Sequence, residues 1–81
     1  MKSKNFPKIY IILDGQRHHI QTLEYFTLMR KYELLEKLKN AKSSEIIDIA
    51  VEVAKLNNIL RKIDELKKVE ANEEVVVELN V

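Results

Sequence analysis

Few side chains in this 81-residue sequence have the types that do chemistry, and the two histidines are the first to consider. His18 and His19 are adjacent, and adjacent residues of a β-strand point to opposite faces. The pair therefore cannot close on one metal ion. The sequence also has no cysteine to complete a zinc site or act as a thiolate nucleophile. We predict that both histidines are ordinary strand residues and that the protein holds no metal and no other cofactor.

Acidic residues and serines are the next candidates for chemistry. Two pairs of carboxylates lie one helical turn apart: Glu33 with Glu36, and Asp48 with Glu52. General acid–base catalysis needs a cleft whose surroundings separate the pKa values of the two groups, and nothing in the pattern indicates one. Ser43 and Ser44 have no nearby base, and a single glycine rules out a glycine-rich phosphate loop. We therefore predict no catalytic residues, no small-molecule substrate and no enzymatic activity.

Basic residues interleaved with aromatic ones near the N-terminus form the third chemical pattern. On a β-sheet, such side chains can hold phosphates and stack on bases. The candidate contacts are Lys4, Lys8, Tyr10, Arg17 and His19. The set is sparse and the net charge is only +1, so we treat a dimeric nucleic-acid-binding regulator as the alternative function.

The charge is distributed unevenly along the chain. Residues 1–42 carry nine basic and four acidic residues, a net +5, whereas residues 43–81 carry five and nine, a net −4. A chain with such a dipole can self-associate through its complementary parts. No apolar run approaches the ~18 residues of a transmembrane helix, and the basic N-terminus lacks the long apolar run of a signal peptide. We expect a cytoplasmic protein with no membrane partner.

A β-hairpin is predicted over residues 8–21. Asp14-Gly15 separates two strand-like runs, and this dipeptide favours a two-residue turn in which both residues have positive φ. The turn pairs Leu13 with Gln16, Ile11 with His18 and Ile9 with Ile20. It also places Ile9, Ile11 and Leu13 on one face, which we expect to point into the core.

Two helices follow, over residues 22–40 and 44–69. Thr22 is the expected N-cap of the first, and Ser43 or Ser44 that of the second. The second helix has a seam with the alternating three- and four-residue spacing of helix-on-helix packing: Ile46, Ile49, Val53, Leu56, Leu60 and Ile63. The first has a shorter one: Tyr25, Leu28, Tyr32 and Leu35. The two seams predict an antiparallel helical hairpin.

The C-terminal residues 74–81 alternate valine and leucine with polar residues, the pattern of a half-buried strand. The predicted fold is a single α+β domain over residues 1–81, with the order β-β-α-α-β and a three-stranded sheet. The simplest sheet is an antiparallel meander with the last strand beside the second. The alternative places the last strand beside the first, in parallel.

The helices carry more apolar surface than one neighbour can cover. A helix that packs on one partner needs an apolar stripe of about 100°, whereas residues 46–53 are apolar over about 200°. A helix of about 26 residues is about 39 Å long, so a small sheet cannot reach its far end. The predicted interface consists of Leu34, Leu38, Ile47, Ala50, Val51 and Ala54. The alternative is a hairpin that folds back over the sheet.

These observations favour a non-enzymatic interaction module that associates through its helical hairpin. Its expected partners are itself, as a dimer or a larger oligomer, and another protein. Such an architecture suits an adaptor, an inhibitor or a subunit of a larger assembly, including a phage or viral accessory protein.

Overall fold

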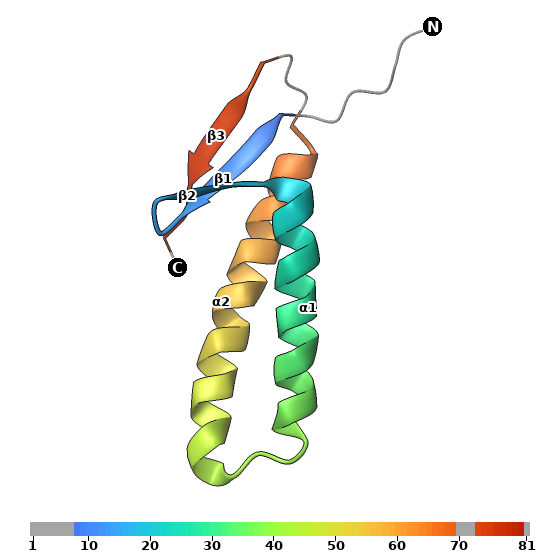
Figure 1. The fold of residues 1–81 in the computed structure, drawn as a ribbon, viewed down its shortest axis with the longest axis vertical. Coiled ribbons are helices and arrows are strands. Elements are labelled where there is room, and N and C mark those ends of the chain that lie inside the picture. Colours follow the sequence, from blue (N-terminus) through green and yellow to red (C-terminus); the bar gives the residue numbers. More distant parts are fainter. Residues whose placement is uncertain (1–7, 70–72, 81) are drawn as a thin grey trace, which may run out of the picture.

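The computed structural model describes residues 8–69 and 73–80 as a small sheet at one end of a long helical hairpin (Figure 1). The elements are β1 (Ile9–Leu13), β2 (Gln16–His19), α1 (Ile20–Leu38), α2 (Ser43–Lys67) and β3 (Val75–Glu78). This is the predicted α+β fold with the order β-β-α-α-β. Strands of four or five residues span only about 17 Å, whereas the 25 residues of α2 span about 38 Å. The hairpin therefore extends well beyond the sheet and does not fold back over it.

The turn between β1 and β2 has the predicted geometry. Asp14 has a φ of 51° and Gly15 a φ of 79°, the left-handed conformation that these two residue types tolerate best. Leu13 pairs with Gln16 and Ile11 with His18, so the predicted register is confirmed for these pairs. The predicted pair of Ile9 with Ile20 is wrong, because β2 ends at His19 and Ile20 begins α1.

The order of the sheet is β2-β1-β3, and β3 runs parallel to β1, with Ile9 opposite Val75 and Ile12 opposite Glu78. The antiparallel meander is therefore wrong, and the alternative arrangement is confirmed. Strand composition explains the order. β1 is apolar along its whole length and takes the central place, whereas the polar β2 forms an edge.

Helix α1 begins two residues earlier than predicted, at Ile20, directly after β2. His19 is its N-cap, and the imidazole Nδ1 accepts a hydrogen bond from the backbone N–H of Gln21 at 3.2 Å. Thr22, the predicted cap, lies inside the helix, because the histidine already satisfies a free N–H group at the helix start.

Helix α2 has its N-cap at Lys42, one residue before the predicted serines. The side chain of Glu45 accepts a hydrogen bond from the backbone N–H of Lys42 at 3.0 Å, the half of a capping box that the acidic residue supplies. Ser43 and Ser44 therefore lie in the first turn of the helix instead of capping it.

The core lies where the sheet covers the near ends of both helices. It consists of Ile9, Ile11, Ile20, Leu23, Ile59, Ile63 and Leu66, with Leu13 and Val75 among the half-buried residues packed against it. The predicted inward face of the β-hairpin is thereby confirmed.

The rotation of α1 about its axis differs from the prediction. The buried side chains of α1 are Ile20, Leu23, Thr27 and Leu34. Tyr25 and Tyr32, the aromatic members of the predicted seam, are 61% and 63% exposed. Because Ile20 follows β2 without a loop and enters the core, it fixes which face of α1 meets α2. The tyrosines then lie on the opposite side of the helix.

Candidate interaction surface

Beyond the sheet, the two helices have only each other to pack against. We call residues 30–54 the distal hairpin; it comprises the second half of α1, the connecting loop and the first half of α2. Leu34, at 2% exposure, is its one fully buried apolar side chain. A pair of helices without a third layer leaves most of its apolar side chains in contact with water.

Most of the apolar residues predicted to form an interface are exposed in this region. Ile47 is 69% exposed, Val51 is 51% exposed and Leu38 is 38% exposed. Ala50 and Ala54 are also exposed, on the same helix as Ile47 and Val51. These residues form an apolar surface on α2 that nothing else in the described chain covers.

Leu34 is the exception among the predicted interface residues. It was expected to point away from the hairpin, and this expectation is wrong, since the side chain is buried. The reason is the rotation of α1. The face that carries Leu23 and Thr27 is turned inward, and Leu34 lies on that same face. Leu34 therefore stabilises the hairpin and offers no surface to a partner.

A second exposed apolar surface, which the sequence pattern does not predict, lies on α1. Besides Tyr25 and Tyr32, it includes Phe26 at 59% and Met29 at 44% exposure. The rings of Tyr25 and Phe26 contact each other edge to face, with centroids 5.3 Å apart. The spacing of the tyrosines predicts packing against α2, and this prediction is wrong, since both side chains are exposed. The apolar Ile20, directly after the second strand, is the signal that identifies the inward face of α1.

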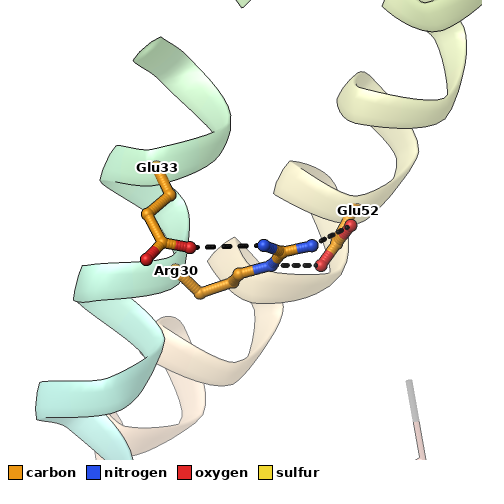
Figure 2. Close-up of polar contacts among 3 residues, drawn as sticks. All are labelled: Arg30, Glu33 and Glu52. Atoms are coloured by element: carbon orange, nitrogen blue, oxygen red, sulfur yellow. Dashed lines mark hydrogen bonds and ion pairs between the residues drawn. The ribbon is translucent and has the colours of Figure 1, made fainter. Parts of the chain in front are cut away.

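An ionic clamp joins the helices within the distal hairpin (Figure 2). The Arg30 guanidinium of α1 donates to both carboxylate oxygens of Glu52 on α2, at 2.9 and 3.3 Å, and to Glu33 at 3.3 Å. These hydrogen bonds raise the pKa of Arg30 above its ordinary value and lower the pKa of Glu52 below its own. Near the sheet, Lys67 donates to Glu24 at 2.7 Å. The two pairs join α1 and α2 at two levels along the hairpin.

The hollow beside this clamp, of about 530 Å³, is open to water. It is lined by Arg30, Leu34, Lys37, Asn40, Glu45, Asp48, Ile49 and Glu52. Its acidic and basic groups remain in contact with water, and the carboxyl of Glu52 has a lowered pKa, opposite to the raised pKa of a general acid. Within residues 8–69 and 73–80, no three potential ligands are grouped to hold a metal ion.

The outer face of the sheet carries the residues of the alternative function. Tyr10 contacts His19 edge to face, with ring centroids 5.3 Å apart, and the Arg17 guanidinium lies 4.2 Å above the Tyr10 ring. Arg17 also forms an ion pair with Glu74. Lys8 is exposed just before β1, and Lys4 lies outside the described residues. The structure thus brings Tyr10, Arg17 and His19 together, but an arginine already covers the tyrosine ring, and that arginine is paired with a carboxylate.

The chain has no significant match to a protein-family model, to a curated protein or to a solved structure. Neither of the two described helices combines the length and the apolar character that crossing a bilayer requires. What the protein does must therefore be inferred from its own geometry.

Proposed function

We propose that this protein is a non-enzymatic interaction module that associates with further copies of itself through its helical hairpin. The observation that carries the proposal is the exposure of large apolar side chains in two groups, one on each helix of the hairpin. Tyr25, Phe26, Tyr32, Ile47 and Val51 are each more than half exposed. Contiguous apolar surface on a small protein marks a site of association.

The position of this surface supports a role in assembly. The core lies at the sheet end of the helices, so the distal hairpin adds little to it. A long hairpin that carries apolar side chains away from the core has the form of an adaptor or of a subunit that joins others. We also propose that the protein acts in the cytoplasm.

Nucleic-acid binding through the outer face of the sheet is the second candidate. The gathering of Tyr10, Arg17 and His19 on one face favours it. The ion pair between Arg17 and Glu74 weighs against it, because phosphate would have to displace a carboxylate. An electrophoretic shift assay decides this point, since true phosphate binding weakens steeply as salt rises.

Sedimentation equilibrium of three proteins tests the main proposal. Wild type is expected to associate, whereas Val51→Glu introduces a charge into the apolar surface and is expected to remain monomeric. Asn57→Glu adds the same charge at an exposed polar position on the same helix, and this control is expected to behave as wild type does. A Val51→Glu protein that associates as strongly as wild type would contradict association through the helical hairpin.

A further inference from the structure

The distal hairpin has little apolar packing of its own. Leu34 is its one fully buried apolar side chain, whereas the seven buried residues of the core all lie at the sheet end of the molecule. Between the two helices of the distal hairpin lies the open hollow of about 530 Å³. Burial of apolar surface, the main source of stability in a folded protein, is therefore slight in this part of the chain.

Opposite charges face each other across this hollow. Its α1 wall carries Arg30 and Lys37, and its α2 wall carries Glu45, Asp48 and Glu52. The charge along the chain has the same division. Residues 30–42 carry five basic and two acidic residues, a net +3, and residues 43–54 carry three acidic residues and no basic one, a net −3. Attraction between these walls therefore holds the two helices together.

Glu52 lies between charged groups from several elements. They are Arg30, Glu33 and Lys37 on α1, Asp48 and Lys55 on α2, and Asp14 in the β1–β2 turn. The hydrogen bonds from Arg30 are the main reason why the pKa of Glu52 lies below its ordinary value, and attraction to Lys37 and Lys55 lowers this pKa further. The folded distal hairpin is thus stabilised when Glu52 is charged.

Such charges can decide the outcome only where the competing forces are small. The side chains of Arg30 and Glu52 are 43% and 41% exposed, and a surface ion pair changes an equilibrium constant by no more than about fivefold. At the sheet end, the ion pair of Lys67 with Glu24 lies beside a buried core that holds without it. In the distal hairpin, only Leu34 is fully buried, so the same kind of pair carries more weight.

From the sparse packing and the facing charges together, we infer that the distal hairpin unfolds as a separate unit, released by acid or by salt, while the core at the sheet end stays folded. Segments with few buried apolar contacts open in this way with less free energy than the whole domain requires. The inference concerns the single chain and does not depend on self-association. Ile47 and Val51 lie in this unit, so its release would also dismantle the surface proposed for association.

Acid and salt act on the unit in different ways. Residues 30–54 carry five basic and five acidic residues, so their net charge rises from 0 at neutral pH to +5 when every carboxyl is protonated. Because the pKa of Glu52 is lowered in the folded state, its stabilisation is complete above the unfolded pKa, about 4.3, and is lost as the pH falls through the lower folded value. In ~1 M salt the Debye length is only about 3 Å, which screens the attraction across the hollow at any pH.

Hydrogen exchange resolved by residue, on dilute protein at neutral pH, tests the inference. Wild type is compared at low salt and in ~1 M sodium chloride. At low salt it is also compared with a triple variant, Glu45→Gln, Asp48→Asn and Glu52→Gln, whose amides remain hydrogen-bond acceptors. Protection in residues 30–54 is expected to fall about tenfold in high salt and in the triple variant, since several weak pairs are lost together. Around Ile11 and Ile63 the expected change is less than about twofold.

A matched control removes an ion pair of the same kind at the other end of the hairpin. Glu24→Gln breaks the pair with Lys67 and is expected to leave protection in residues 30–54 as it is in wild type. An equal loss of protection in residues 30–54 and around Ile63 would overturn the inference, because the chain would then unfold only as a whole. Unchanged protection in residues 30–54 in high salt would overturn it too, and this result needs no variant to fold.

Discussion

The two ends of the helical hairpin are built from the same kinds of residue but use them differently. At the sheet end, Ile59, Ile63 and Leu66 enter a core completed by strands β1 and β3. In the distal hairpin, Ile46, Ile47 and Val51 are exposed on the same helix. An apolar side chain in a helix therefore stabilises the fold where another element covers it, which is the sheet for these core residues and the facing helix for Leu34. Elsewhere it forms a surface that is available for association.

The largest effect is expected from truncation at the sheet end. Ile63 is fully buried, so Ile63→Ala removes buried methyl and methylene groups and leaves a cavity. The expected loss in the free energy of unfolding is about 2–5 kcal/mol, a large part of the ~5–15 kcal/mol of a typical domain. Urea denaturation followed by circular dichroism measures it. An unchanged denaturation midpoint would contradict the placement of the core.

A smaller loss is expected from the same kind of truncation in the distal hairpin. Leu34 is buried between only two helices, which can close around the space that Leu34→Ala leaves. We expect a loss of about 2 kcal/mol, at the low end of the range for buried leucines. The same urea denaturation, carried out on dilute protein, measures it. A loss below that of an exposed leucine such as Leu38→Ala would show that Leu34 is not buried.

The smallest effect is expected from the ionic clamp, and it depends on pH. Since Arg30 lowers the pKa of Glu52, the folded state is stabilised above the pKa of the unfolded carboxyl, about 4.3, and this stabilisation is lost as the pH falls through the lower folded value. Glu52→Gln should therefore reduce stability at neutral pH and flatten its decline in acid. Thermal unfolding at several pH values measures this. Parallel curves for the two proteins would contradict the clamp.

The β-hairpin could be predicted from its local sequence. The place of β3 and the rotation of α1 could not, because they depend on packing between residues far apart in the chain. Asp14-Gly15 specifies a turn by itself, so the register of β1 and β2 followed from the sequence. The place of β3 depends on which strand is best buried on both faces, a property of the assembled sheet. The rotation of α1 depends on Ile20, whose side chain is committed to the core by the strand before it.

The part of the candidate interface on α2 could be predicted from the sequence, and the part on α1 could not. Surplus apolar surface on α2 was visible because only one helix can cover it, and Val51 and Ile47 are indeed exposed. On α1, the most regular apolar spacing belongs to the outer face. The pattern therefore places Tyr25 and Tyr32 against α2 and Leu34 on the outside, whereas the structure shows the reverse. Periodicity identifies an apolar face without indicating which neighbour that face meets.

Hydrogen exchange at low and high protein concentration tests the central claim most directly, because it reports on both ends of the hairpin at once. Exchange of a backbone amide slows where association stabilises the structure around it. The predicted result is slower exchange in residues 30–54 at high concentration, with a smaller change around Ile11 and Ile63 in the core. Exchange in residues 30–54 that is equally fast at both concentrations would contradict self-association through the hairpin.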